Sequence, residues 1–344
     1  MRRTSMVGYA AVVAFCVSAG VAGAPAQPPE PANLAAAGKR IAVWDIPDID
    51  QLPDDEHGRL VRYGRSVLEA TARHIGPDAP DPVMRFAGNN LACTSCHLDA
   101  GRKKFGLPLV AAAADYPLYS ARSGELASLE DRLDSCMTRS MNGRPMPRDV
   151  RPMRALVAYL TVLSSALPRG AAIEGAGAGA MAELDRPADP ARGAVIYART
   201  CVFCHGEDGR GLVRNGADAS LGYGVPPLWG PDSFNDGAGM NRLVTIANFV
   251  HDNMPAGIDW LMPALVPADA WDVAAYVASR GRPHREGLEK DFPDLLDKPV
   301  DAPYGPYADS FPQAQHKYGP FAPIRAEIAR LKAEKGTVPN PDAR

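Results

Sequence analysis

Two copies of one cysteine–histidine pattern constrain this chain more than any other feature of its sequence. Residues 93–97 have the sequence CTSCH and residues 201–205 have the sequence CVFCH, so a histidine directly follows each Cys-x-x-Cys pair. Random placement of 6 cysteines and 7 histidines among 344 residues would give roughly 0.002 such matches per chain. A disulfide scaffold or a zinc ribbon explains the paired cysteines but leaves the adjacent histidines without a role.

A predicted helix precedes each motif, which indicates an internal duplication. Before the first motif, apolar side chains recur at helical spacing over residues 58–74. Before the second motif, Asp189 is a suitable N-cap and Pro190 a suitable first helical residue. This pair predicts a helix that ends at Cys201.

Each of the two units also closes with a helix that has one apolar face. The predicted closing helices cover residues 149–167 and 268–280, and both contain an Ala-Tyr-Leu/Val step. The chain has 32 glycines and 33 prolines, which is well above average usage. This composition favours short helices joined by irregular loops over a large sheet.

The N-terminus has the features of a secretory signal peptide. Arg2 and Arg3 precede an apolar run over residues 6–24, and a small-x-small cleavage site ends at Ala26. A membrane anchor is the alternative, but the alanine- and glycine-rich run and the nearby cleavage site favour removal. We therefore expect a periplasmic protein without a stable membrane anchor. Lys plus Arg (37) nearly balances Asp plus Glu (40), so no nucleic-acid partner is expected.

Composition also marks the boundaries between the parts of the chain. Residues 170–180 (GAAIEGAGAGA) have the low complexity of a flexible linker, and the segment after residue 281 is rich in Pro and Tyr. We expect the charged, helix-prone run at its end, residues 324–335, to be peripheral. The predicted organisation is a signal peptide (1–26), an N-terminal arm (27–57), a first domain (58–169), a linker (170–188), a second domain (189–281) and a C-terminal extension (282–344).

The Cys-x-x-Cys-His pattern is typical of covalent haem attachment. Two thiols form thioethers with the haem vinyl groups, and the following histidine becomes the proximal ligand of the iron. A redox-active or zinc-binding cysteine pair is the alternative, but the flanking helices, the duplication and the signal peptide favour haem. We therefore expect two covalently bound haem c groups in a mainly α fold. This fold would have two class-I-like cytochrome c domains in tandem, a flexible linker and a long irregular C-terminal tail. The predicted attachment residues are Cys93, Cys96, Cys201 and Cys204, with proximal ligands His97 and His205.

The sixth ligand of the second haem is expected in the loop before the closing helix. Three methionines are candidates, namely Met240, Met254 and Met262. Met254 and Met262 each precede a proline that helps to fix the loop. We favour Met254 because it leaves more chain to cross the haem face. The alternative for any single methionine is plain core packing.

The first unit offers two candidates for the sixth ligand. Met146 lies just before the closing helix, whereas Cys136 is the one cysteine of the mature chain outside a motif. Cys136 shares a predicted helix face with Arg132 and Ser140, and nearby cations favour the thiolate that binds iron. Burial of Cys136 as an inert thiol is the alternative. Three further arginines were expected to add positive charge near this helix: Arg139, Arg144 and Arg148.

Several longer stretches carry a resemblance to a known family. They cover residues 88–98, 129–143, 234–242, 253–255, 270–276, 297–299, 304–309 and 315–321. In these stretches the chain resembles the dihaem thiosulfate dehydrogenase family of bacterial periplasmic cytochromes c. The similarity runs in order from about residue 58 to residue 324, which is more specific than two haem motifs.

The resemblance implies a role for each candidate residue. It implies that His97 and Cys136 ligate an active-site haem, and that His205 and Met254 ligate an electron-exit haem. The family's substrate-binding positions fall on Arg122, Arg132 and Ser140. Some members have a lysine beside the ligand methionine, where this chain has Asn253, so no Lys-for-Met ligand exchange is expected.

The resemblance also implies the reaction. Two thiosulfate ions would be oxidised to tetrathionate, with electrons passing from haem 1 to haem 2 and on to an external acceptor such as a soluble cytochrome c or a high-potential iron–sulfur protein. Arginines suit this substrate because thiosulfate is a small dianion. Three alternatives stay open. The same site run in reverse would be a tetrathionate reductase, a plain dihaem electron-transfer cytochrome would bind no substrate, and a sulfur-conjugating cytochrome would require a partner subunit.

Overall fold

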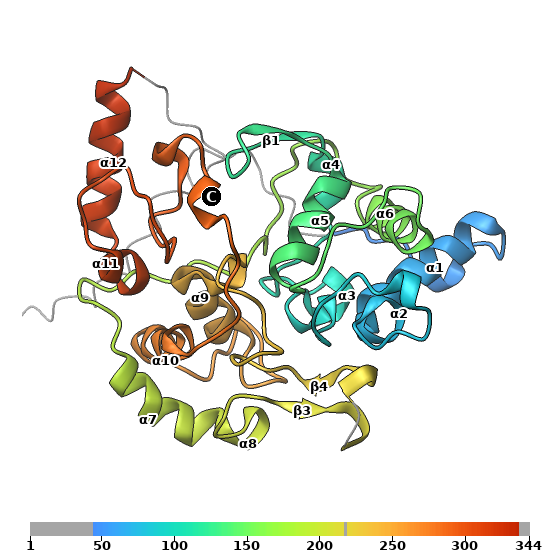
Figure 1. Cartoon of the computed structure of the whole chain (residues 1–344), viewed down its shortest axis with the longest axis horizontal. Helices are drawn as coiled ribbons and strands as arrows, with labels where there is room; N and C mark the ends of the chain where they lie inside the picture. The colour runs from blue at the N-terminus through green and yellow to red at the C-terminus, as the bar shows by residue number, and fades with distance from the viewer. Residues whose placement is uncertain (1–43, 217–218, 337–344) are drawn as a thin grey trace, which may run out of the picture. The chain divides into compact units, whose positions relative to one another are not determined.

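The computed structural model describes residues 44–216 and 219–336, and most of their regular structure is helical (Figure 1). The strands in this part of the chain form two short antiparallel ribbons. One pairs β1 (Leu118–Ser120) with β2 (Glu125–Ala127), and the other pairs β3 (Leu212–Val213) with β4 (Tyr223–Val225). The mainly α prediction is therefore confirmed. The predicted signal peptide and most of the N-terminal arm lie outside the described residues.

The first domain contains six helices. The predicted helix over residues 58–74 is divided at Ala70, because the Thr71 hydroxyl bonds to the Val67 carbonyl (2.8 Å) and accepts the amide N–H of Cys93 (3.1 Å). This break ties the helix end to the first motif. The helices are α1 (Glu56–Glu69), α2 (Thr71–Ile75), α3 (Leu98–Gly101), α4 (Ala112–Asp115), α5 (Leu129–Arg139) and α6 (Arg151–Leu163).

Helices α1 and α6 cross in direct backbone contact at Gly64. A Cβ atom on Gly64 would lie 2.0 Å from the carbonyl oxygen of Ala155 and 2.8 Å from Cβ of Tyr159. Real Cβ atoms do not approach other atoms this closely, so only glycine fits between the two helices. Around this crossing, Val61, Val67 and Tyr159 are fully buried in the first domain's core.

The second domain repeats this crossing with different residues. Asp189 accepts hydrogen bonds from the amides of Ala191 (2.8 Å) and Arg192 (3.3 Å), so the predicted N-cap is confirmed. A Cβ on Gly193 would lie 1.9 Å from the carbonyl oxygen of Asp272 and 2.9 Å from Cβ of Tyr276. The helices of this domain are α7 (Pro190–Thr200), α8 (Val202–His205), α9 (Leu243–Asn253) and α10 (Pro267–Ser279). The predicted duplication therefore extends to the packing.

The glycine-rich segment between the domains packs against the first domain. The amide of Phe105 donates to the carbonyl of Gly175 (2.7 Å), and the amide of Leu107 donates to that of Gly177 (3.0 Å). Two side chains of this segment, Ile173 and Ala178, are also buried. Its backbone therefore supports the loop that follows the first motif.

The charged run over residues 324–335 is not wholly peripheral, so this expectation was wrong in part. The described part of the C-terminal extension has the α-helices α11 (Gln313–Tyr318) and α12 (Ala322–Glu334). The charged helix was correctly predicted, but its Ile324 is fully buried and the preceding Phe321 packs against Trp271 of α10 (ring centroids 6.2 Å apart). Two apolar side chains in a charged run give little periodic signal, yet they complete the second domain's core.

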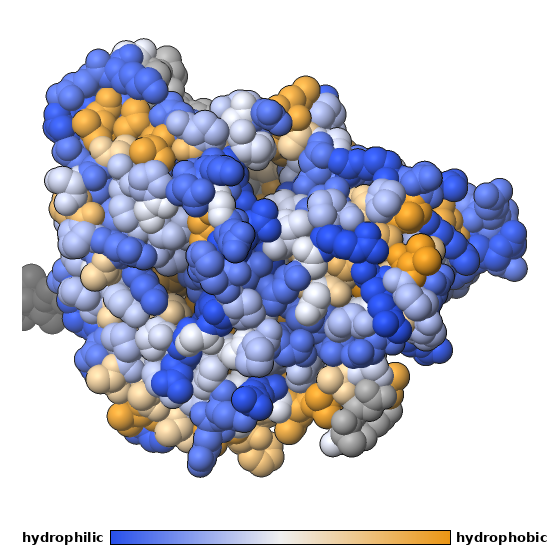
Figure 2. All heavy atoms as spheres, in the orientation of Figure 1, coloured by the Kyte–Doolittle hydropathy of each residue, from blue (hydrophilic) through white to orange (hydrophobic). Residues whose placement is uncertain are grey.

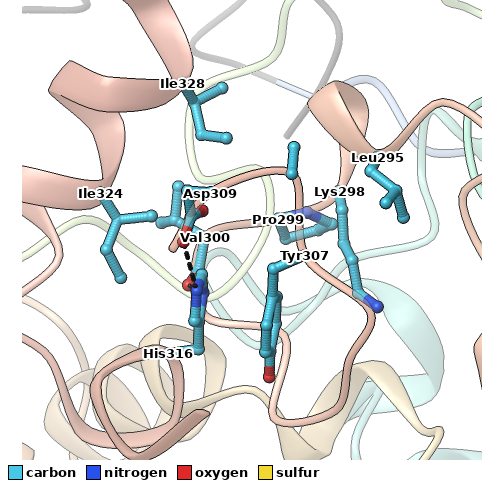
Figure 3. Close-up of a pocket in the computed structure, with 10 residues that line it drawn as sticks. Leu295, Lys298, Pro299, Val300, Tyr307, Asp309, His316, Ile324 and Ile328 are labelled. Carbon is cyan, nitrogen blue, oxygen red and sulfur yellow. Dashed lines mark hydrogen bonds and ion pairs between the residues drawn. The ribbon is translucent and has the colours of Figure 1, made fainter. Parts of the chain in front are cut away.

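Side chains also interlock within the extension (Figure 3). His316 is buried, and its Nε2 lies 3.1 Å from a carboxylate oxygen of Asp309 while its Nδ1 lies 2.8 Å from the carbonyl of Val300. The ring of Tyr307 stacks on that of His316 with centroids 3.6 Å apart. A cavity of about 10 Å³ remains beside these residues. The extension is therefore a packed structure rather than a loose tail.

Hydrophilic side chains cover most of the face shown in Figure 2, and hydrophobic ones appear as scattered patches. In residues 44–216 and 219–336, no helix has the length and apolar composition of a membrane span.

The close helix contact at Gly193 predicts the direction in which a substitution there changes the free energy of unfolding. Replacing Gly193 with Ala adds intrinsic helix propensity worth about 1 kcal/mol. We nevertheless expect Gly193→Ala to lower the free energy of unfolding by about 2 kcal/mol or more, because the new methyl group forces α7 away from α10. Thermal and denaturant unfolding of the haem-loaded protein measure the change. A stabilised Gly193→Ala protein would show that the crossing is looser than described.

Candidate functional site

The structure brings the first motif and Cys136 together. Burial, with a smaller contribution from the nearby Cys136 sulfur, raises the pKa of Cys93 to about 11 and that of Cys96 to about 12. Burial also lowers the pKa of His97 to about 4, which keeps its imidazole neutral. The three motif side chains are only half-buried by surface area. They therefore lie deep in the protein but keep accessible surface for a group held between them.

Both motif histidines are oriented as metal ligands. Nδ1 of His97 lies 2.6 Å from the carbonyl oxygen of Leu107, and Nδ1 of His205 lies 3.1 Å from that of Pro226. A carbonyl oxygen only accepts, so the proton is on Nδ1 and the lone pair is on Nε2. Neither Nε2 has a hydrogen-bond partner among the described residues. Such an arrangement is typical of metal-bound histidine.

The donor set fits haem better than zinc. Over residues 44–216 and 219–336, no three His, Cys, Asp or Glu side chains converge into a site that could hold a metal ion by themselves. A zinc site needs such a set of protein ligands, whereas haem supplies four nitrogen ligands of its own. Haem c bound through Cys93, Cys96, Cys201 and Cys204 is thus consistent with the geometry at both motifs.

Helix α5 presents the predicted anion-binding face. It begins with a capping box in which Ser128 and Asp131 exchange hydrogen bonds, and Ser140 forms its C-cap. Arg132 is exposed and makes no hydrogen bond or ion pair within the described part of the chain. Its pKa is raised, chiefly by the Cys136 sulfur, which places these two side chains within electrostatic reach of each other.

Arg122 reaches the same region from another element. It lies in the turn between β1 and β2, where burial, together with the positive charges of Arg139 and Arg132, lowers its pKa to about 10. The one hydrogen bond of its guanidinium to a described residue is a long contact with the Gly237 carbonyl (3.4 Å). Arg122 and Arg132 are therefore two neighbouring cations without a carboxylate partner, as an anion site requires.

Two of the three further arginines near α5 are paired with carboxylates, so they add less positive charge to the site than expected. Arg139 is buried in a two-pronged ion pair with Asp291 (2.6 and 2.8 Å). Arg148 pairs with Asp131 and Asp134. Arg144 stacks on the ring of Phe86, with 4.4 Å between its guanidinium carbon and the ring centroid. Each of these arginines holds a part of the structure together.

Met146 is a core residue of the first domain. Its side chain is 2% exposed, and its amide donates to a carboxylate oxygen of Asp134 (2.8 Å). Cys136 instead lies within electrostatic reach of Cys93 and Cys96. Of the two candidates for the sixth ligand of haem 1, Cys136 is therefore the one with accessible surface and an electrostatic interaction with the motif cysteines.

The three candidate methionines of the second domain have different environments. Met262 is 79% exposed, and Met240 packs against the core of the first domain. Met254 is half-buried at the C-cap of α9. The preceding Asn253 is buried, and its side-chain N–H donates to the carbonyls of Phe249 (3.1 Å) and Phe105 (3.0 Å). Asn253 therefore fixes the backbone that carries Met254.

Several residues of this region escaped the sequence analysis. The carbonyls of Leu107 and Pro226 orient the two histidines, and Asp291 neutralises Arg139 from the C-terminal extension. Every residue has a backbone carbonyl, so the residue type does not reveal which carbonyl orients a histidine. Asp291 lies 152 residues from its partner, so no local pattern connects the two.

The fold and the two motif geometries define a protein of the cytochrome c class with two cytochrome c domains in tandem. Family models support each domain separately. Residues 85–168 match the cytochrome c domain of SoxA/TsdA, and residues 188–277 match the family of cytochrome C oxidase, cbb3-type, subunit III.

The relatives identify the family. The chain is 36% identical over 270 residues to the thiosulfate dehydrogenase of Thiomonas intermedia, which covers 78% of this chain and 81% of that protein. It is 39% identical over 240 residues to the thiosulfate dehydrogenase of Stutzerimonas stutzeri, which covers 69% of this chain and 72% of that protein. The chain therefore belongs to the thiosulfate dehydrogenase family, a family of oxidoreductases, and the resemblance seen in the sequence is confirmed.

A solved structure agrees with this assignment. The thiosulfate dehydrogenase TsdBA of Marichromatium purpuratum, in its as-isolated form, is 33% identical and superposes with a TM-score of 0.62. The match covers 79% of this chain and 54% of that chain, so the present chain spans about half the length of that protein.

The motif geometry predicts the haem content of the protein. We expect two covalent haems per chain in the wild type and one in a Cys93→Ala/Cys96→Ala variant, because the second motif keeps both of its thiols. The same loss is expected for Cys201→Ala/Cys204→Ala. Haem-to-protein ratios from the alkaline pyridine spectrum measure this, and Cys136→Ala is the control that keeps two haems. Two haems in either double variant would contradict the assignment.

Proposed function

We propose that this protein is a periplasmic dihaem cytochrome c that oxidises two thiosulfate ions to tetrathionate. The observation that carries the proposal is that Arg132 lies within electrostatic reach of the Cys136 sulfur, with Arg122 near Arg132 and neither arginine in an ion pair within the described residues. Membership of the thiosulfate dehydrogenase family supports it. The proposed active-site domain covers residues 58–169, and the electron-exit domain covers residues 189–281.

The arginines lower the electrostatic cost of the reaction. Joining two dianions end to end is opposed by Coulomb repulsion, which is strong at short range in a partly desolvated site. Guanidinium groups also donate to sulfonate oxygens in fixed geometry, and the Ser140 hydroxyl offers a further donor on the same helix face. These three side chains would hold thiosulfate with its outer sulfur towards Cys136.

Cys136 divides the coupling into two steps in which atoms and electrons balance. In the first step, its thiolate forms a sulfur–sulfur bond with the outer sulfur of thiosulfate, and two electrons are released. In the second step, the outer sulfur of another thiosulfate attacks that sulfur, which releases tetrathionate and restores the Cys136 thiolate. No proton is transferred in the net reaction, so the site needs no acid–base residue.

Bound haem would supply the electron acceptors, with the electrons passing from the first haem to the second and on to an external carrier. The proposed ligands are His97 and Cys136 in the first domain, and His205 and Met254 in the second. The carrier would be a soluble cytochrome c or a high-potential iron–sulfur protein. Export to the periplasm rests on the predicted signal peptide, and it suits covalent haem, which the protein cannot lose.

The role of Cys136 is tested by replacing it. We expect Cys136→Ala to reduce thiosulfate-dependent reduction of ferricyanide at least about 100-fold, because the variant lacks the sulfur that joins the substrate. The wild-type oxidised protein should show the electron paramagnetic resonance signal of a thiolate-ligated low-spin haem, and the variant should lack it. A wild-type protein with two His/Met signals would be a plain electron carrier.

The anion site is tested by shortening its cations. Arg122→Ala and Arg132→Ala should each raise the KM for thiosulfate about tenfold or more, because each variant loses charge-assisted hydrogen bonds to the dianion. Haem content and optical spectra should stay unchanged in both variants. Unchanged KM values in both would refute the assignment. A much faster reaction with tetrathionate as the electron acceptor would favour the reductase alternative.

A further inference from the structure

Two adjacent residues of the C-terminal extension contact both elements that carry the proposed anion-binding side chains. Asp291 forms the two-pronged ion pair with Arg139 on α5. The amide of Phe292 donates to the carbonyl oxygen of Arg122 in the β1–β2 turn (2.8 Å). A single dipeptide thus connects α5 to the turn that presents Arg122.

The ion pair between Asp291 and Arg139 is buried, and both carboxylate oxygens of Asp291 accept hydrogen bonds. The side chains of Arg139 and Asp291 are 9% and 10% exposed. One carboxylate oxygen of Asp291 also accepts the hydroxyl of Tyr304 (2.7 Å), and Arg139 donates in addition to the Gly237 carbonyl (3.1 Å). Both carboxylate oxygens are therefore occupied, so Asp291 forms no ion pair with Arg122, although its negative charge raises the pKa of Arg122 from a distance.

The Phe292 side holds Arg122 through both backbone and ring. The guanidinium carbon of Arg122 lies 5.6 Å from the centroid of the Phe292 ring, which is within cation–π range. Phe292 is buried and has a φ of 60°, a left-handed conformation that is strained for a bulky residue. Strain of this kind persists only where the surroundings fix the residue.

The neighbouring residues fit the same turn closely. Gly124, in the β1–β2 turn, has a φ of 73°, and a Cβ there would lie 3.1 Å from Cγ of Pro293. Behind Phe292, the ammonium of Lys298 lies 5.9 Å from the Phe292 ring and donates to the carbonyl of Pro306 (2.9 Å). Figure 3 shows Lys298 beside the Tyr307 ring, which is itself stacked on His316. The dipeptide is therefore held by closely packed residues of the extension.

We propose that Asp291 and Phe292 are positioning residues for thiosulfate, which set the spacing between Arg122 and the α5 residues Arg132 and Ser140. The inference rests on the proposed function, in which these three side chains bind the substrate. Within the described residues, no side chain of the first domain holds the Arg122 guanidinium. The C-terminal extension is thus part of the active site, although it lies far from it in sequence.

The first test separates the Phe292 ring from the backbone contact. Phe292→Leu keeps a buried apolar side chain but loses the ring, so the KM for thiosulfate should rise about fivefold or more while kcat changes little. Phe292→Tyr keeps the ring and should restore the KM. Calorimetric titration of ascorbate-reduced protein with thiosulfate measures binding without turnover, and Phe292→Leu should weaken this binding by the same factor.

The second test uses the sign of a charge change. Asp291→Asn removes one negative charge, so electrostatics alone would tighten binding of a dianion. Positioning predicts the opposite, a KM raised about tenfold, because Arg139 loses its bidentate partner and α5 is released from the turn. Glu289→Gln is the matched control, since Glu289 is exposed on the same segment and its loss carries the same charge change. Its KM should stay within about twofold of wild type.

The outcomes distinguish this inference from the proposed function. If Arg122→Ala raises the KM but Phe292→Leu does not, or if Asp291→Asn lowers the KM as the loss of a negative charge alone would, the positioning role is wrong and the proposed function stands. If Arg122→Ala leaves the KM unchanged, the substrate site itself is wrong and the inference falls with it. Haem content and optical spectra of every variant confirm that the protein measured is folded.

Discussion

The close approach of two helices at a glycine, once in each domain, is the constraint on which the rest of this structure depends. At Gly64 and again at Gly193, a backbone carbonyl of the partner helix occupies the space that any side chain would need. From the crossing at Gly193, α7 continues to Thr200, and Cys201 caps its end. In the first domain, the break after α1 delivers Thr71 to the amide of Cys93. Helix packing thus determines where the thiols of both motifs lie.

The cations that stabilise the fold differ from those of the proposed substrate site in their partners. The cations that stabilise the fold have carboxylate or aromatic partners, as Arg139 has Asp291 and Arg144 has Phe86. Arg122 and Arg132 have no carboxylate partner among the described residues, although burial lowers the pKa of Arg122 to about 10. Keeping a cation buried and unpaired costs stability. A dianionic ligand between the two arginines would offset that cost, which connects the electrostatics to the proposed substrate.

Sequence alone predicted the features that depend on local spacing. The two Cys-x-x-Cys-His motifs, the N-cap at Asp189 and the shared face of Arg132 and Cys136 all follow from residues within one or two helical turns. The importance of the C-terminal extension was missed, because Ile324 completes a core whose other residues come mainly from positions 188–278, well before it in the chain. The carboxylate partners of Arg139 and Arg148 were missed for the same reason. Whether a surface cation is free depends on tertiary neighbours.

The central proposal is that Cys136, Arg122 and Arg132 join two thiosulfate ions to form tetrathionate. The products of the reaction test this proposal most directly. Thiosulfate consumed, tetrathionate formed and ferricyanide reduced can be measured together by ion chromatography and absorbance in a single anaerobic reaction of the haem-loaded protein. The account predicts two thiosulfate ions consumed and two electrons accepted for every tetrathionate formed. Reduction of the acceptor with sulfite or sulfate as the product, and no tetrathionate, would contradict it.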